Sequence, residues 1–191
     1  MTAARSHAGA GLALALAGAI AFSGKAIIVK LSYRYGVDAV TLIMYRMLFA
    51  LPLFAGMAWW AGRGKAPLTR ADWAAVVGLG FCGYYLSSFL DFLGLQYITA
   101  SLERLILYLN PTMVMLFGWL LYRRPWSARQ LAGMAISYAG VALVFGQELH
   151  IAGGNVALGS GLVFASTVSY ALYMVYSGQV VQRLGSLRLV G

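Results

Sequence analysis

Five charged side chains lie in segments of this sequence that are otherwise apolar enough to cross a bilayer: Lys25, Arg46, Asp91, Glu103 and Arg104. An ionisable group at the centre of a membrane helix costs roughly 2.5 to 3.5 kcal/mol to insert, so it usually faces a charged partner or a wet cavity. From a rise of about 1.5 Å per residue, all five fall in the outer halves of their helices. Three cations and two anions in that half predict a charged cavity open to the outside.

Two of these charges also have structural interpretations. Glu103 sits near the first turn of its helix, where the dipole favours a carboxylate, so helix capping and a place on a transport pathway both remain open. Asp91 lies in the last turns of its helix, where the dipole opposes an anion, so one of the three cations is expected to compensate it. A structural ion pair is the favoured interpretation for Asp91, and proton exchange during transport is the alternative.

Polar and aromatic residues extend this candidate site along the helices. Tyr84, Ser88 and Asp91 share one helix face at i, i+4 and i+7, and Tyr170 and Tyr173 belong to a second hydroxyl stripe. Such stripes either join helices by hydrogen bonds or line a pocket, where rings could stack on a planar or amphipathic solute. The predicted pathway residues are Lys25, Arg46, Tyr84, Ser88, Asp91, Glu103, Arg104, Tyr108, Asn110, Pro111, Tyr170 and Tyr173.

Three other kinds of site, for a dinucleotide, a metal ion or a catalytic nucleophile, lack the neighbouring residues or elements that they need. Residues 78–83 have Gly-x-Gly-x-x-Gly spacing but lie inside an apolar run, so close helix packing explains them better than a dinucleotide site. His7 and His150 have no Cys or carboxylate cluster at ligand spacing, and no His accompanies a Ser or Cys within a helix. We therefore expect no metal, no cofactor and no enzymatic activity.

The composition indicates an all-α, polytopic membrane helix bundle, because 61% of the residues are hydrophobic and only 10% are charged. The net charge of +9 does not indicate nucleic-acid binding, since the basic residues lie in short segments between apolar runs rather than on one polar face. The apolar runs predict about six membrane helices, over residues 9–31, 39–61, 71–95, 99–122, 127–145 and 155–182.

Local signals refine these helices. Asp38 can cap the second helix, and the third and fifth helices begin with capping-box spacing at Thr69 and Ser127. Pro111 lies near the middle of the fourth helix, where it cannot donate a backbone hydrogen bond, so a kink or break is expected there. The small residues Gly133 and Gly140 predict a face of the fifth helix that a neighbour can approach closely.

The loop charges predict the orientation of the helices. Lys and Arg concentrate in the amino end, the linkers after the second and fourth helices and the carboxyl tail, whereas Arg34 is alone on the opposite side. By the positive-inside rule, both termini are expected to be cytoplasmic. The five Trp residues fall near the predicted cytoplasmic ends, as an interfacial belt would.

The sixth helix weakly repeats the first, since Arg183-Leu184-Gly185 matches Arg34-Tyr35-Gly36. A five-helix unit that repeats must reappear upside down in the membrane, which is the inverted-repeat architecture of many secondary transporters. Residues 9–146 would then be the first repeat, and residues 155–191 the start of a second, apparently truncated one.

Short motifs through the chain carry a resemblance to a known family: Tyr45-Arg46, Asn110-Pro111, Gly118-Trp119-Leu120-Leu121, Arg129-Gln130-Leu131-Ala132-Gly133 and Gly140-Val141-Ala142-Leu143. Together with the lysine-containing end of the first helix, they resemble the EamA type of the drug/metabolite transporter superfamily. The resemblance implies a ten-helix fold of two inverted repeats with the substrate cavity between them. Arg123-Arg124 departs from the family, which often has an acidic residue followed by a basic one there.

This resemblance implies a secondary transporter, an exporter of small polar or amphipathic metabolites in the bacterial inner membrane. The expected partners are the lipid bilayer, a small-molecule substrate and either a homodimer or the missing second repeat. No nucleic-acid partner is expected. The alternative is a truncated, non-transporting membrane scaffold whose charges form only structural ion pairs.

Overall fold

The computed structural model describes residues 16–191 except positions 21, 124 and 146–154. Helices make up most of this part of the chain, and no strand occurs among the described residues. The helices are α2 (Lys25–Arg34), α3 (Ala39–Gly62), α4 (Arg70–Gly80), the π-helix η1 (Phe81–Leu86), α5 (Ser87–Gly94), α6 (Ala100–Leu107), α7 (Asn110–Tyr122), α8 (Ala128–Phe145), α9 (Val156–Leu184) and α10 (Ser186–Val190).

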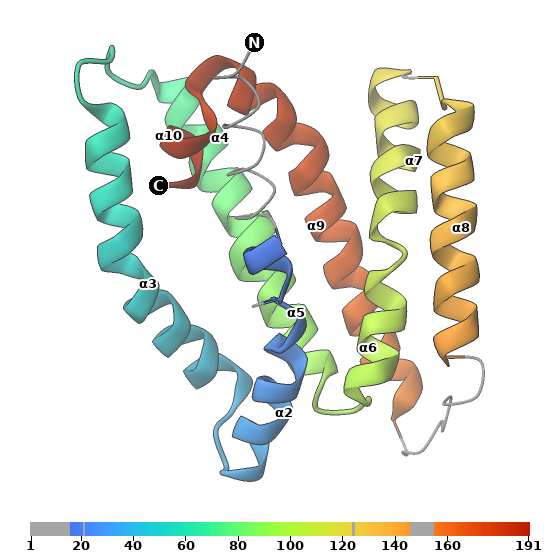
Figure 1. Ribbon diagram of the computed structural model, residues 1–191. Coiled ribbons are helices and arrows are strands. Elements are labelled where there is room, and N and C mark those ends of the chain that lie inside the picture. The colour runs from blue at the N-terminus through green and yellow to red at the C-terminus, as the bar shows by residue number, and fades with distance from the viewer. Residues whose placement is uncertain (1–15, 21, 124, 146–154) are drawn as a thin grey trace.

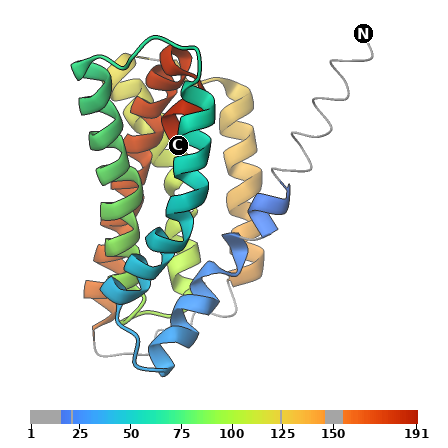
Figure 2. The same cartoon turned by 90° about the vertical axis from the view of Figure 1, so that its left-hand side faces the viewer.

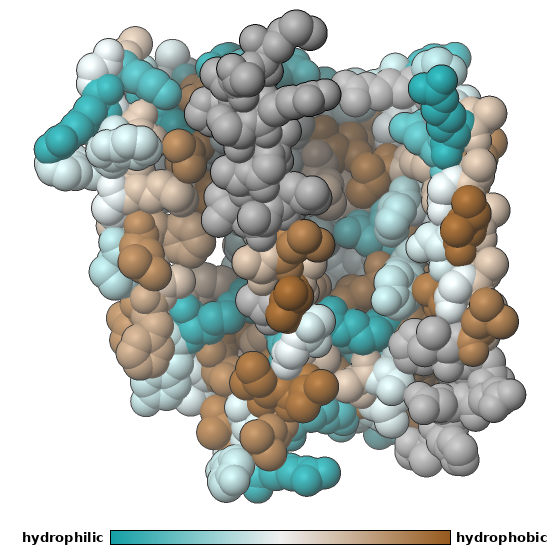
Figure 3. All heavy atoms as spheres, viewed as in Figure 1, coloured by the Kyte–Doolittle hydropathy of each residue, from teal (hydrophilic) through white to brown (hydrophobic). Residues whose placement is uncertain are grey.

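Five helical stretches of the described chain are long and apolar enough to cross a membrane: Leu16–Arg34, Ala39–Gly62, Arg70–Gly94, Ala100–Tyr122 and Val156–Leu184. The helix expected over residues 127–145 is present as α8, although it is not among these five. Hydrophilic side chains gather mainly at the two ends of the bundle, with further ones in its recessed middle (Figure 3). The prediction of an all-α, polytopic bundle is confirmed.

The predicted helix starts are present. The Asp38 carboxylate accepts hydrogen bonds from the Val40 and Thr41 amides at the start of α3. At the start of α4, the Thr69 hydroxyl accepts from the Asp72 amide while the Asp72 carboxylate accepts from the Thr69 amide. Each cap satisfies amides that helix geometry leaves without a carbonyl partner, which is why the helices begin at these residues.

The Asp38 cap predicts a pH dependence of stability. Hydrogen bonds, first of all from Thr41, hold the pKa of the Asp38 carboxyl below its ordinary value. The ionised cap therefore stabilises the fold at pH values above the unfolded-state pKa of about 3.9, and this contribution is lost as the pH falls through the lower folded pKa. We expect Asp38→Asn, which keeps an acceptor oxygen, to make the thermal unfolding midpoint less steeply pH-dependent in acid. Equal slopes for the variant and the wild type would contradict this.

Helix α9 lies at the centre of the bundle, where it packs against α5, η1, α6 and α7 (Figure 1). Two glycines, Gly94 of α5 and Gly159 of α9, allow these helices to approach closely. A Cβ atom added at Gly94 would lie 2.8 Å from the Gly159 carbonyl oxygen, and a Cβ atom added at Gly159 would lie 3.0 Å from the Gly94 carbonyl oxygen. No described helix uses the face predicted at Gly133 and Gly140, since no described atom lies within 4 Å of a Cβ at either position, and the close approach there stays a prediction. Small residues predict where helices can meet, but not which pairs do.

An apolar core joins α2, α3 and α5. It contains Ala26 and Val29 from α2, Ile43 from α3 and Phe92 from α5. Figure 2 shows α2 inclined to α3, the two helices meeting at the turn over residues 35–38. This core holds the segment that carries Lys25 against the segment that carries Asp91.

The break predicted at Pro111 is present. The fourth span divides into α6 and α7, with Tyr108 and Leu109 outside both helices and Pro111 in the first turn of α7. The Tyr138 hydroxyl of α8 lies 3.3 Å from the Tyr108 carbonyl oxygen and donates to it. A proline is tolerated at a helix start because its missing N–H would have no partner there, so the chain begins a new helix at this point.

The π-helix η1 was not expected. It interrupts the third span over Phe81–Leu86, where bonding from residue i to i+5 rotates all later side chains relative to a regular α-helix. A Cβ at Gly83 within it would collide with the Tyr173 ring of α9. Glycine therefore permits the contact between η1 and α9, which confirms close packing for one glycine of the Gly78–Gly83 motif.

The ends of the bundle differ in composition. The carboxyl ends of α3 and α7 and the amino ends of α4 and α8 lie at one end (Figure 1). All five Trp residues belong to these helix ends and their adjoining loops, and all are exposed. Arg183, in the last turn of α9, forms an ion pair there with Asp72. The predicted tryptophan belt is thus gathered at one end, and the side of the membrane that it faces stays a prediction.

Candidate functional site

Four of the five predicted intramembrane charges meet in one network, which we call the charge cluster: Lys25, Asp91, Glu103 and Arg104. The Lys25 ammonium forms an ion pair with the Asp91 carboxylate and lies 3.3 Å from Glu103 Oε1. Glu103 Oε2 in turn lies 3.4 Å from Arg104 Nε. The cluster therefore alternates cation and anion across α2, α5 and α6.

The two carboxylates are almost fully removed from solvent. The side chain of Glu103 is 0% exposed and that of Asp91 is 4% exposed, against 18% for Lys25. Within the described residues, Asp91 Oδ1 and both carboxylate oxygens of Glu103 accept no hydrogen bond of good geometry. Buried carboxylates with unused lone pairs depend heavily on their cations, so this network is easily perturbed by charge changes.

The arrangement bears on one of the two interpretations of Glu103, that of a helix cap. The Thr99 hydroxyl, 3.2 Å from the Leu102 amide, caps α6, while the Glu103 side chain faces Lys25 and Arg104. Glu103 therefore does not act as the cap. Arg104 is positioned in addition by the carbonyl oxygens of Phe22 and Ser23, at 2.9 and 3.0 Å. These carbonyls come just before α2 begins, so Arg104 ties α6 to the start of α2.

The fifth charge, Arg46, lies beside the cluster without joining it. Its Nη2 donates to the Ser88 hydroxyl at 2.7 Å, and its guanidinium lies 5.3 Å from the centroid of the Phe92 ring. Lys25 Nζ lies 5.8 Å from the same centroid. Arg46 and Lys25 thus both lie near one aromatic ring. Its cation–π attraction helps to stabilise a site in which three cations have only two anions.

The predicted tyrosines form a second group, which we call the tyrosine group: Tyr84, Tyr170 and Tyr173. The ring of Tyr173 lies 5.6 Å from that of Tyr84 in an edge-on arrangement and 5.6 Å from that of Tyr170. Tyr84 precedes Asp91 by seven residues, a distance of about 10 Å along a helix. In the structure Tyr84 packs against the α9 tyrosines whereas Asp91 pairs with Lys25, so the expected stripe has an aromatic part and a charged part.

Two serine hydroxyls of α9 join it to the third span. Ser166 donates to the Ser87 carbonyl oxygen at 2.6 Å, and Ser169 donates to that of Cys82 at 2.9 Å. Both acceptors lie at or beside η1, where i to i+5 bonding alters the usual pairing of backbone carbonyls. Ser177, by contrast, donates to the Met174 carbonyl of its own helix.

The remaining predicted residues lie around the helix break. The side chain of Tyr108 is exposed and Pro111 opens α7. Asn110 turns toward α9, where its Nδ2 lies 4.0 Å from Met174 Sδ, and its Oδ1 is buried without a hydrogen-bond partner among the described residues. None of these three joins the charge cluster or the tyrosine group through a described side-chain contact.

The structure adds residues that sequence reasoning missed. Phe92 contacts two of the cations, and Phe22 lies 5.1 Å from Lys25 Nζ and 5.2 Å from the Arg104 guanidinium. Neither ring has a distinctive spacing, because apolar aromatic residues are common in membrane spans. The only sequence signal that could have pointed to either ring is that Phe92 directly follows Asp91, an acid within an apolar span.

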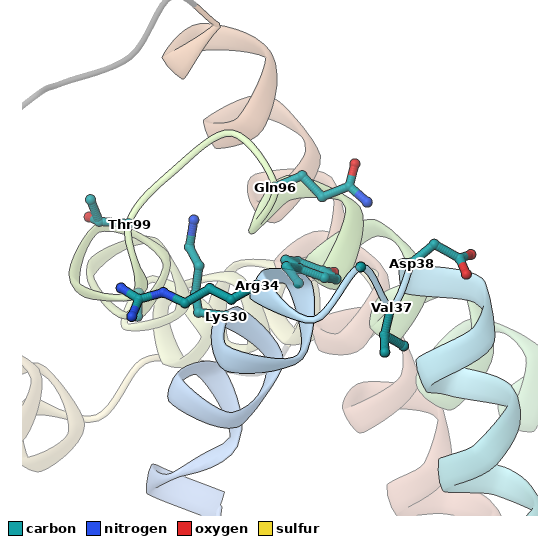
Figure 4. A pocket seen from close by; sticks show the side chains of 9 residues that line it. Lys30, Arg34, Val37, Asp38, Gln96 and Thr99 are labelled. Atoms are coloured by element: carbon teal, nitrogen blue, oxygen red, sulfur yellow. The ribbon is translucent and has the colours of Figure 1, made fainter.

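An open pocket of about 700 Å³ lies where the turn before α3 meets the loop before α6 (Figure 4). Its lining includes Lys30, Arg34, Gln96 and Thr99, and none of the twelve predicted pathway residues. Within the described part of the chain, no group of three His, Cys, Asp or Glu side chains comes together to hold a metal ion.

Comparison with known proteins agrees with a transporter. Uncharacterized transporter YcbK of Bacillus subtilis is 32% identical over 200 residues, which cover 96% of this chain and 59% of the relative. An uncharacterized transporter of Archaeoglobus fulgidus is 29% identical over 161 residues, covering 84% of this chain and 54% of the relative. The chain thus spans about half the length of these curated relatives. No solved structure gives a significant match.

The model of the EamA-like transporter family matches residues 9–146, which contain the charge cluster, Arg46 and the helix break. The family and its relatives are named as transporters rather than enzymes, and the apolar helices fit a multi-pass membrane protein. On this match and on the similarity to YcbK, the chain belongs to the EamA-like transporter family.

Proposed function

We propose that this chain acts in secondary transport, exporting small polar or amphipathic metabolites such as amino-acid-like solutes across the bacterial inner membrane. The observation that carries the proposal is the charge cluster. Two buried carboxylates share Lys25, and three of their oxygens accept no described hydrogen bond. Such an arrangement inside membrane helices is costly, and transport pathways and proton relays are its common uses.

In this proposal, Arg46 and Arg104 attract the carboxylate or phosphate of the solute, and the tyrosine group packs against its apolar part. Glu103 or Asp91 exchanges the coupling proton. Protonation of either acid would release Lys25 from one of its two partners, so proton binding and the arrangement of α2, α5 and α6 would change together. The break at Pro111 supports this, since discontinuous helices commonly line transporter sites.

The proposed orientation puts the tryptophan-rich end of the bundle and both termini in the cytoplasm. The basic loops at that end support it through the positive-inside rule. The greater length of the relatives supports a cavity shared with a second five-helix repeat, and a second copy of this chain is the alternative partner.

Proton coupling is tested with proteoliposomes that contain the chain, an imposed pH gradient and a mixture of ¹⁴C-labelled amino acids as the probe. We expect gradient-driven flux with the wild type, and at least a tenfold loss in Glu103→Gln with solute exchange at equilibrium retained. The reason is that an amide cannot carry the proton although it fills the same volume.

The matched control is Asp38→Asn, an equally conservative change at an exposed helix cap, which should leave the flux unchanged. Gradient-driven flux that persists in Glu103→Gln would leave Asp91 as the proton carrier, and flux that persists in Asp91→Asn as well would mean that the carboxylates form structural ion pairs only. If the wild type shows no gradient-dependent flux although cross-linking shows that it forms a dimer in the proteoliposomes, secondary transport of this solute class would be contradicted.

A further inference from the structure

The open pocket at the end of the bundle opposite the tryptophans presents two cations that the charge cluster does not use. Lys30 and Arg34 lie one helical turn apart on α2, so their side chains leave the same face of the helix. Within the described chain, neither side chain forms an ion pair. Figure 4 shows both on the same side of the pocket as Thr99.

The one acid among the described residues that line this pocket is already engaged. Asp38 Oδ2 lies 3.1 Å from the Val40 amide and 3.3 Å from the Thr41 amide, both of which donate to it. In Figure 4 its carboxylate points away from Lys30 and Arg34. Asp38 therefore serves the start of α3, and no acid among the described residues balances the positive charge of the two α2 side chains.

The other polar groups of the lining can donate hydrogen bonds. Thr99 accepts from the Leu102 amide, so its own hydroxyl hydrogen is free to point elsewhere. The exposed Gln96 also carries an amide NH₂ group, which points away from Lys30 and Arg34 in Figure 4. The Tyr33 hydroxyl is occupied, since it donates to the Phe92 carbonyl oxygen at 2.6 Å, and its ring serves as a wall. Two cations with neutral donors around an open space are suited to a phosphate, which an Arg fork can bind through two oxygens.

We propose that this pocket binds a phosphate group, carried either by a soluble anion or by the headgroup of an anionic lipid. Lys30 supplies a point charge, Arg34 the planar fork and Thr99 a neutral hydrogen bond. The site is separate from the proposed transport pathway, so it stands or falls independently of transport.

The test is binding of inorganic phosphate to the chain purified in a zwitterionic detergent, followed by the thermal unfolding midpoint. We expect phosphate to raise the midpoint saturably, and sodium chloride of matched ionic strength not to do so. Lys30→Gln with Arg34→Gln should weaken phosphate binding at least tenfold. The matched control is Arg63→Gln with Lys65→Gln, which removes two cations from the opposite end of the bundle and should leave binding unchanged.

Nanodiscs then distinguish the two sources of the phosphate group. If phosphatidylglycerol, compared with phosphatidylcholine, raises the wild-type midpoint and abolishes the response to free phosphate, the ligand is a headgroup. If free phosphate still acts in phosphatidylglycerol, the ligand is soluble. Equal responses of the wild type and the double glutamine variant, or equal effects of phosphate and chloride, would overturn the site. Should the double variant not fold, each single variant is expected to weaken binding severalfold.

Discussion

Replacing Lys25 with Met is expected to lower the free energy of unfolding by about 3 to 5 kcal/mol, the usual cost of breaking a buried ion pair from one side. Lys25 is the only described cation in contact with Asp91, and it is one of two in contact with Glu103. Methionine fills a similar volume, so lost packing contributes little. The measurement is reversible unfolding in mixed micelles, with the equilibrium followed by circular dichroism.

Two further variants make this result specific. Lys30→Met applies the same change on the same helix, to a lysine without a described ion pair, and should cost less than about 0.5 kcal/mol. Lys25→Met combined with Asp91→Asn removes both partners, so its cost should be clearly smaller than the sum of the two single changes. Equal costs for Lys25→Met and Lys30→Met would show that the cluster does not stabilise the fold.

Replacing Gly94 with Ala is expected to destabilise the protein by about 1 to 3 kcal/mol, because the new methyl group has no room. A Cβ at Gly94 would lie 2.6 Å from Val163 Cγ2 and 2.8 Å from the Gly159 carbonyl oxygen, and that second contact is with backbone. A side chain could turn aside, but relieving the backbone contact requires α5 and α9 to separate. Gly159→Ala should have an effect of the same size, measured by the same unfolding equilibrium.

Gly161→Ala is the matched control, since Gly161 lies on α9 close to Gly159 but no described atom lies within 4 Å of its Cβ position. There the higher helix propensity of alanine should stabilise the protein by about 0.5 to 1 kcal/mol. If Gly94→Ala were as stabilising as Gly161→Ala, the close approach of α5 and α9 would be wrong.

Sequence reasoning predicted the local structure well. Asp38, Thr69 and Ser127 begin helices as expected, because a cap depends only on residues within one turn. Pro111 interrupts its span for an equally local reason, its missing backbone donor. The π-helix gave no such signal: a regular helix explains the same residues equally well until the contact between Gly83 and Tyr173 is known.

In the candidate site, too, the sequence predicted one part and only the tertiary structure decided the other. That Lys25, Asp91, Glu103 and Arg104 need partners follows from the sequence alone, since charge in an apolar span must be compensated. Which partner each one takes was decided by the tertiary structure. Any of three cations could have met Asp91, and the packing of α2 against α3 and α5 puts Lys25 there while Arg46 turns to Ser88. Periodicity fixes only the face of a helix, whereas ion pairing depends on which helices are neighbours and at what depth they cross.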